Sequence, residues 1–502
     1  MRGLAVAMLE ARDFAAETSS RSSKLIHGGL RYLPQFQFRL VRNALRERER
    51  LRRLTAPHLV RPVRFLFPLY RGRGFGRGRM VAGLFLYDLF ARIPRSERHR
   101  SLSAEEVLEL EPMLAGEGLA GGATYCDAWA DDARITLENV LDAALHGAAV
   151  ANYASVEGFS RMGGRLGAAS VRDRLSGRGF EVRARLFVNA AGPWVDDVRR
   201  MEDRAVAPCI RLTKGVHLVF PRERLPVRES LVLSDDRDRI VFVMPHGRYV
   251  LVGTTDTDFA GDPAVVAADR GDVQYLLDVL GQTLRGAVPG AADVASSFAG
   301  LRALVTTSAS RAPSSVPREE VLLDSDAGMI TVAGGKLTTH REIAEKVVNH
   351  ALKKLGRAGG KSPTAITPLP GARPLQAGDP SAAKALQGLD PITREILDSR
   401  YGSRAVRVAA IIAGHPALAA PLAEGCSAVA GEVLHAIRDE MACSLADFMV
   451  RRTSLVWRAP LEAVAAAPAA ASLMARELGW DRAREEAEVR DFIHDMQRRR
   501  SP

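Results

Sequence analysis

Hydroxyl groups, paired glycines and cations occur together in one short stretch, residues 18–33, which reads TSSRSSKLIHGGLRYL. Its first three residues supply hydroxyls and backbone N–H groups that suit pyrophosphate or sugar oxygens. Gly28 and Gly29 allow the backbone to approach a flat ring closely, and Arg31 presents a planar fork that matches a phosphate. Taken alone, the stretch is equally compatible with a site for a phosphorylated ligand and with a serine-rich turn before a helix.

Two strand–turn–helix units could position such a ligand. The first has a strand at 186–188 in RLFVNAAGPWVDDV, and the second has a strand at 330–333 followed by Gly334–Gly335 in MITVAGGKLTTHREIAEKVV. Thr339 and Glu342 predict a capping box at the start of the second helix. Units of this kind build parallel, doubly wound sheets whose helix N-termini attract anions.

The rest of the chain has a different pattern. Residues 210–259 alternate between apolar and polar positions or run apolar between polar turns, which predicts an antiparallel sheet covering the substrate. A linker rich in glycine and proline follows at 356–374, and the alanine-rich remainder predicts a helical C-terminal domain. GEGLAG at 116–121 matches a dinucleotide-binding pattern, but we reject it because an acidic, helical segment precedes it rather than a strand.

Composition limits the class of protein. The 502 residues suffice for two or three domains, and 70 basic against 59 acidic residues leave a net charge of +11. This excess indicates either an arginine-rich surface or an anionic partner such as phosphate, a membrane surface or nucleic acid. The four cysteines lie far apart without a CxxC pair, which argues against disulfides or zinc and fits a reducing compartment.

The most apolar run is MVAGLFLYDLF at 80–90, and no signal peptide is recognisable. This run is shorter than the roughly 20 residues of a spanning helix, and Asp88 interrupts it. Arginine-rich segments flank it on both sides. It is therefore either a helix lying on an anionic bilayer surface or a buried core helix.

Seven blocks of the sequence resemble, in the same order, the FAD-dependent, quinone-linked glycerol-3-phosphate dehydrogenases. They are TSSRSSKLIHGGLRYL, TYCDAWADDARITLENVLDAA, NAAGPWVD, KGVHLVF, YVLVGTTDTDF, GLRAL and AGGKLTTHR. The tail block EVLHAIRDEMACSLADFMVRRTSL is similar to the C-terminal domain of that family, so the resemblance covers nearly the whole chain.

This resemblance implies an α/β fold: a glutathione-reductase-like, Rossmann-type FAD-binding domain with an antiparallel substrate domain, followed by an all-α domain. The expected boundaries are 1–355 for the oxidoreductase region (FAD-binding parts about 1–60, 120–205 and 300–355; substrate sheet about 206–300), 356–374 for the linker and 375–502 for the helical domain.

It also implies a set of site residues. FAD is expected to contact Glu10, Thr18, Ser19, Ser20, Lys24, Leu25, Val156, Ala190, Gly192, Gly335, Leu337 and Thr338. Glycerol 3-phosphate is expected to bind Arg31, Tyr32 and Arg311, and catalysis is expected to use His217, Arg302 and Lys336. No metal is expected.

The chemistry of these residue types agrees with the implied roles. Glu10 ends the strand-like LAVAMLE, where an acid commonly binds ribose hydroxyls, although a surface acid is the alternative. His217 is our choice of base because imidazole titrates near neutral pH, although a structural histidine is the alternative. Arg302 is protonated at every accessible pH and is expected to polarise the developing carbonyl.

The chain departs from the family before Glu10. The family has a strand, a GxGxxG turn and a helix upstream of this acid, whereas nine residues precede it here. We expect two unpaired strand edges in the middle of the parallel sheet and a missing cradle for the pyrophosphate. Either the sequence starts too late, which the intact downstream blocks favour, or the protein is truncated and binds FAD weakly or not at all.

The implied partners are glycerol 3-phosphate, a membrane quinone and the inner face of the cytoplasmic membrane, with a homodimer possible and no nucleic acid. Four alternatives stay open: an oxidase that reduces oxygen, an FAD amine or hydroxy-acid oxidase, a basic non-enzymatic protein that binds nucleic acid or lipid, and an inactive truncated homologue.

Overall fold

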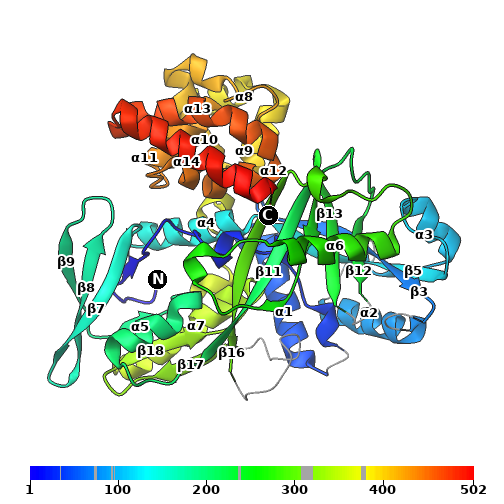
Figure 1. The fold of residues 1–502 in the computed structure, drawn as a ribbon. Coiled ribbons are helices and arrows are strands. Elements are labelled where there is room, and N and C mark those ends of the chain that lie inside the picture. Colours follow the sequence, from blue (N-terminus) through cyan, green and yellow to red (C-terminus); the bar gives the residue numbers. More distant parts are fainter. Residues whose placement is uncertain are drawn as a thin grey trace.

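The computed structural model describes residues 1–33, 36–72, 76–91, 94, 97–235, 239–306, 320–374 and 380–501. A wide sheet forms the body, smaller sheets lie beside it, and a helical domain stands apart on one side (Figure 1). The α/β fold class with a C-terminal all-α domain is confirmed.

The wide sheet has ten strands in the order β15-β11-β14-β13-β12-β3-β5-β2, with β16 paired to β11 and β4 to β5. The pairs are antiparallel except β12 with β3. Besides the expected strands it includes β2, β3, β4 and β5; the other three pair with β5, which is buried almost throughout. Its strands are β2 Leu25–Ile26, β3 Val60–Tyr70, β4 Arg100–Leu102, β5 Leu119–Ala130, β11 Ile210–Pro221, β12 Ser230–Ser234, β13 Ile240–His246, β14 Tyr249–Gly253, β15 Thr257–Asp258 and β16 Ser296–Val305.

The strand–turn–helix units form small parallel pairs. β1 (Ala7–Leu9) pairs with β6 (Ala149–Ala151), and β10 (Phe187–Asn189) pairs with β18 (Met329–Ala333), which also pairs with β17 (Val321–Asp324). Within the described residues the second edges of β1 and β10 have no partner strand, as expected. A separate antiparallel sheet contains β7 Ala154–Met162, β8 Arg165–Asp173 and β9 Gly179–Arg183.

Helices pack around these sheets. They are α1 Phe38–Arg50, α2 Arg77–Ala91, α3 Ala104–Leu110, α4 Asp132–Leu145, α5 Val195–Glu202, α6 Arg270–Thr283 and α7 His340–Lys354. The predicted capping box at α7 is wrong. A 3₁₀ turn, Leu337–Thr339, precedes α7, and the Thr339 hydroxyl donates to the Lys336 carbonyl within that turn (3.3 Å).

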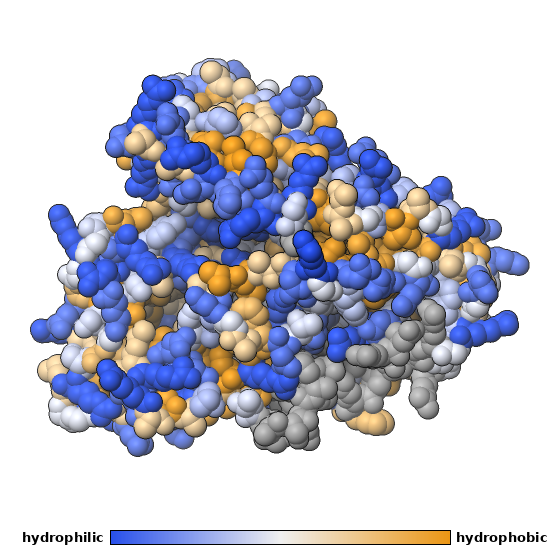
Figure 2. Space-filling model, viewed as in Figure 1, coloured by the Kyte–Doolittle hydropathy of each residue, from blue (hydrophilic) through white to orange (hydrophobic). Residues whose placement is uncertain are grey.

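The C-terminal helices form the domain at the top of Figure 1. They are α8 Pro380–Gly388, α9 Pro391–Tyr401, α10 Ala405–Gly414, α11 Ala430–Arg438, α12 Leu455–Arg458, α13 Pro460–Leu478 and α14 Arg482–Arg500. Most alanines of α13 are buried, which lets neighbouring helices approach closely. On the face drawn in Figure 2, hydrophobic residues form scattered groups among hydrophilic ones.

Buried ion pairs join this domain to the body. Arg452 binds Asp13 through two hydrogen bonds of 2.6 and 2.9 Å, and Arg134 of α4 binds Glu440 through two of 2.6 and 2.9 Å. We call these residues the interdomain joint. Its charges are stable in the interior because each guanidinium meets a carboxylate with bidentate geometry.

None of the helices in the described ranges combines the length and the hydropathy that crossing a bilayer requires.

Candidate functional site

Two glycine-bearing turns meet at the centre of the candidate site. The His27 N–H donates to the Thr338 hydroxyl (3.2 Å), which joins the turn before α7 to the Gly28–Gly29 turn. The Lys336 ammonium lies 3.7 Å from the centre of the Tyr32 ring, close enough for a cation–π contact. Two segments some 300 positions apart in the sequence are thereby brought together, as the resemblance implies.

The backbone at this meeting point has no room for side chains. A Cβ added to Gly29 would lie 2.4 Å from the Tyr32 ring, and one added to Gly335 would lie 2.6 Å from Ile343. Gly29 and Gly335 also have positive φ angles of 79° and 95°, which other residues rarely adopt. Bare peptide N–H groups beside a lysine suit the flavin end of FAD, whose ring becomes negative when it is reduced.

The serine-rich stretch is tied to the protein itself. Lys24 is buried, and its ammonium forms an ion pair with Asp132 (2.6 Å) and donates to the Ser20 carbonyl. Thr18 donates to the Leu301 carbonyl of β16 (2.8 Å), and Leu25 is packed in the main core. These contacts hold the stretch between α4 and β16, so its backbone, with Ser19, is what remains to face a ligand.

A second network holds Gly28 in place. The Gly28 N–H donates to the Tyr87 hydroxyl (2.8 Å), and that hydroxyl donates to Asp127, which also binds Arg48 (2.7 Å). We did not predict this role for Tyr87 or Arg48 from the sequence. Asp127 lies in the block TYCDAWADD. The resemblance of this block to the family was the sequence signal that could have indicated a role for Asp127 in the site.

His217 lies buried at the centre of β11. Its ring stacks on Phe298 of β16 with centroids 4.8 Å apart, and its Nε2 is 2.9 Å from the Ser23 hydroxyl. Its Nδ1 has no hydrogen-bond partner among the described residues. Burial, and then the positive charges of Arg302 and Lys24, lower the pKa of His217 well below its ordinary value, so the ring is neutral near pH 7.

Arg302 lies on β16 beside the same ring. Its guanidinium donates to the Thr254 hydroxyl (3.0 Å), the Thr255 carbonyl (3.2 Å) and the Asp256 carboxylate (3.3 Å). A Cβ on Gly215 would lie 2.3 Å from this guanidinium, and a Cβ on Gly253 would lie 2.3 Å from the His217 ring. Both glycines are therefore part of the site, although their lack of a side chain offered no signal in the sequence.

Four more of the residues expected to contact FAD belong to the smaller sheets: Glu10, Ala190 and Gly192 follow strands of the parallel pairs, and Val156 lies in β7 of the antiparallel sheet. Glu10 follows β1 and accepts a hydrogen bond from the Arg12 N–H (3.0 Å), and burial raises its pKa. Val156 packs in the same hydrophobic cluster as Leu9. Ala190 and Gly192 follow β10, and their contact with the cofactor stays a prediction. Arg311 and the side chain of Arg31 lie outside the described part of the chain.

A buried neutral imidazole, a neighbouring guanidinium and bare backbone beside a lysine fit the chemistry of an oxidoreductase that works with a bound flavin. Family comparison agrees: residues 1–341 match the model of the FAD dependent oxidoreductases, and residues 362–485 match the model described as the C-terminal domain of alpha-glycerophosphate oxidase. The protein uses FAD.

Individual proteins similar to the chain narrow the class. It is 37% identical to Glycerol-3-phosphate dehydrogenase 2 of Mycobacterium bovis, over 98% of this chain and 84% of that protein. It is 33% identical to the Aerobic glycerol-3-phosphate dehydrogenase of Staphylococcus aureus, over 99% and 91% of the two chains. The solved glycerol-3-phosphate dehydrogenase of Bacillus halodurans with FAD has a TM-score of 0.80 and 29% identity, over 100% of this chain and 91% of that one. The chain belongs to the FAD-dependent glycerol-3-phosphate dehydrogenase family.

Proposed function

We propose that the protein oxidises sn-glycerol 3-phosphate to dihydroxyacetone phosphate and passes the electrons to a membrane quinone. The names of the relatives support the substrate. The observation that carries the proposal is the buried, neutral His217 beside Arg302, because oxidation of an alcohol needs a base next to a group that stabilises the developing carbonyl.

FAD supplies the hydride acceptor when it is bound. Nδ1 of His217 takes the proton of the C2 hydroxyl, and the Ser23 hydroxyl at Nε2 holds the imidazole in orientation. Arg302 polarises the oxygen that becomes the carbonyl. Lys336, with the N–H groups of residues 335–338, would hold the flavin end of FAD and would favour the negative charge that reduction places there.

The cations proposed for the site also suit the phosphate group of the substrate. A phosphate with nearly two negative charges needs several cations because its desolvation is costly. Arg31, Arg311 and Lys336 are the cations that we propose for it, with Tyr32 beside Lys336. The arriving dianion opposes the effect of Arg302 on His217, so the pKa of the base rises toward neutrality when substrate binds.

We propose that this reaction takes place at the cytoplasmic face of a membrane, where a quinone is accessible. The test is anaerobic titration of the purified protein with glycerol 3-phosphate. We expect the visible absorbance of the oxidised flavin to bleach with this compound and to stay unchanged with glycerol. An oxidised flavin in excess glycerol 3-phosphate would contradict the proposal.

One observation supports a second candidate, an oxidase that reduces oxygen. Residues 362–485 match a model described by the C-terminal domain of alpha-glycerophosphate oxidase. Stoichiometric hydrogen peroxide during aerobic turnover would favour the oxidase, whereas slow reoxidation by oxygen and fast reoxidation by a soluble quinone would favour the dehydrogenase.

A further inference from the structure

Helix α2 is apolar on two opposite faces. Its inner face, Met80, Leu84, Tyr87 and Ala91, is buried in the main core. Its outer face, which we define as Gly78, Ala82, Phe85 and Leu89, repeats at the same helical spacing but is exposed. The Phe85 and Leu89 side chains are 61% and 60% exposed. A helix that is apolar all round is normally covered on every side, so the outer face lacks the apolar contact that its sequence is suited to.

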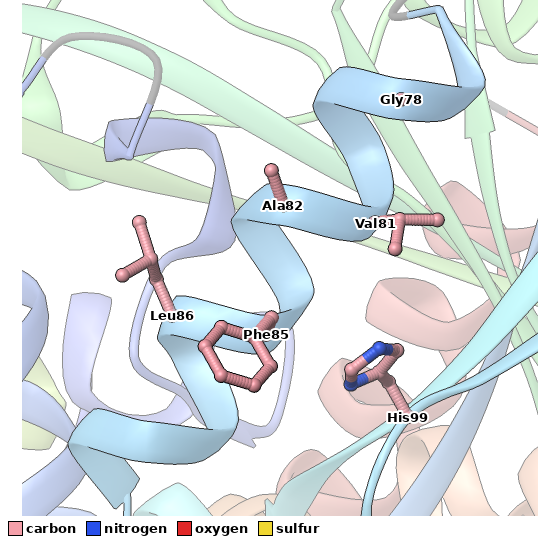
Figure 3. A pocket seen from close by; sticks show the side chains of 6 residues that line it. All are labelled: Gly78, Val81, Ala82, Phe85, Leu86 and His99. Carbon is pink, nitrogen blue, oxygen red and sulfur yellow. The ribbon is translucent and has the colours of Figure 1, made fainter.

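More aromatic surface adjoins this face. α1 packs against α2, and Phe38 at the start of α1 makes edge-to-face contacts with Phe36 (6.0 Å) and with Phe90 of α2 (6.2 Å). Phe36 is 79% exposed. Val81, Ala82, Phe85 and Leu86 of α2 line an open groove together with His99, and Figure 3 shows their side chains on the helix. The groove has a volume of about 720 Å³.

The positive charge of the sequence is concentrated in the stretch that contains α1 and α2. Residues 36–100 contain 17 arginines and four acidic residues, an excess of 13, whereas the whole chain has an excess of 11. The remaining residues therefore have a slight net negative charge. Two of the acids, Glu47 and Asp88, are buried, while Arg39, Arg42 and Arg46 of α1 are exposed. The solvent around α1 and α2 consequently meets cations and apolar side chains together.

We propose that the outer face of α2, with Phe36 and Phe38, lies in the interface of an anionic lipid bilayer. Apolar side chains enter the boundary between headgroups and acyl chains, and the surrounding arginines attract lipid phosphates. Aliphatic Leu89, Ala82 and Val81 favour lipid over nucleic acid, since stacking on bases needs aromatic rings and not an aliphatic helix face. This proposal rests on the membrane location given under the proposed function and identifies the surface involved.

The position of α2 gives this contact a consequence for electron transfer. Tyr87 on the inner face holds the Gly28 N–H of the flavin-side turn, while Phe85 and Leu89 on the outer face contact the lipid. The lipid and that turn are then separated by the thickness of one helix, roughly 10–12 Å. A quinone at the bilayer surface would reach the vicinity of the flavin without leaving the membrane.

The test is co-sedimentation of the full chain with phosphatidylcholine vesicles that contain about one-third phosphatidylglycerol. We expect binding at low salt that weakens at roughly 1 M salt and is weak to pure phosphatidylcholine. The double variant Phe85→Ser/Leu89→Ser should bind about 30-fold more weakly, because its apolar area cannot enter the interface. Arg39→Ser/Arg42→Ser should lose affinity by a similar factor.

The matched control is Val265→Ser/Ile392→Ser, which removes two exposed apolar side chains elsewhere and should bind as the unsubstituted protein does. Equal binding by the Phe85→Ser/Leu89→Ser variant would overturn the proposal. The proposal would also be overturned if the protein bound RNA, or formed a dimer through this face, and did not bind the vesicles. Dye-linked oxidation of glycerol 3-phosphate, measured in parallel, should be unchanged in the variants; its absence in every protein would contradict the proposed function and leave the lipid result standing.

Discussion

Two buried histidines in different regions have pKa values shifted in opposite directions. His217 lies in the candidate active site, and its pKa is lowered well below 6.5 by burial and by Arg302 and Lys24. His435 lies beside the interdomain joint, next to Glu440. Burial acts against its charged form as well, but the carboxylates of Asp439 (3.0 Å) and Glu440 (3.5 Å) raise its pKa.

The difference shows that burial alone does not set the charge of a residue. The joint places carboxylates against each cation, so charge is neutralised within the protein. The site places the cations Arg302 and Lys24 near a neutral ring, and their carboxylate partners, Asp256 and Asp132, bind the cations and not the imidazole. The first arrangement serves to hold two domains together, and the second keeps the imidazole neutral, so that it can accept a proton.

The largest expected effect is a difference in kcat between variants of the two histidines. His217→Asn should lower kcat for glycerol 3-phosphate by about 10²–10⁴-fold, because the base is lost. His435→Asn should leave kcat per folded molecule within a few-fold. The measurement is steady-state oxidation with a soluble dye, with bound flavin as the measure of folded enzyme. A His217→Asn enzyme that retains most of its kcat would remove this histidine from catalysis.

The next effect tests the neutralised joint. Arg134→Met leaves Glu440 buried with only part of its positive surroundings and should destabilise the protein by about 3–5 kcal/mol in urea unfolding. The double variant Arg134→Met/Glu440→Gln should recover part of this loss, because the uncompensated charge is removed. A loss below about 1 kcal/mol in the single variant would show that the joint does not depend on this pair.

A smaller effect tests the position of the cation beside His217. Gly215→Ala places a methyl group 2.3 Å from the present position of the Arg302 guanidinium, which must move. The fold should tolerate this because the end of an arginine side chain is flexible, while kcat/KM should fall about 10²-fold. Gly158→Ala on β7 is the control, since no atom lies within 4 Å of its added Cβ. Unchanged kcat/KM in Gly215→Ala would mean that Arg302 is not positioned by this contact.

The smallest effect is a difference in pH dependence. With its pKa lowered, His217 is neutral in the folded state, so stability relative to His217→Asn should fall as the pH decreases below 6.5. With its pKa raised, His435 contributes stability that is complete below 6.5 and is lost as the pH rises through its folded value. Each slope is limited to about 1.4 kcal/mol per pH unit. The measurement is the free energy of unfolding in urea, below pH 6.5 for His217 and above pH 6.5 for His435, each relative to its own His→Asn variant. The contribution of His217 should increase with pH and that of His435 should decrease; slopes of the same sign would contradict the comparison.

Local patterns predicted much of the fold. The strands expected at 186–188 and 330–333 are β10 and β18, each shifted by one residue at one or both ends, and the helical tail and antiparallel sheet are present. Rejection of GEGLAG as a dinucleotide loop is correct, because Leu119 within it starts β5. The capping box at Thr339 failed because the sequence pattern does not show that a 3₁₀ turn precedes the helix.

The sequence by itself determined the family, the cofactor and the types of residue at the site, because motifs of this kind depend on spacing within short segments. The tertiary structure alone decided which charged groups are neutralised. Lys24 is paired with Asp132, and His217 faces Phe298 and lies near Arg302. Those pairings depend on strand register and on packing between distant segments, and an alternating strand pattern is compatible with more than one register.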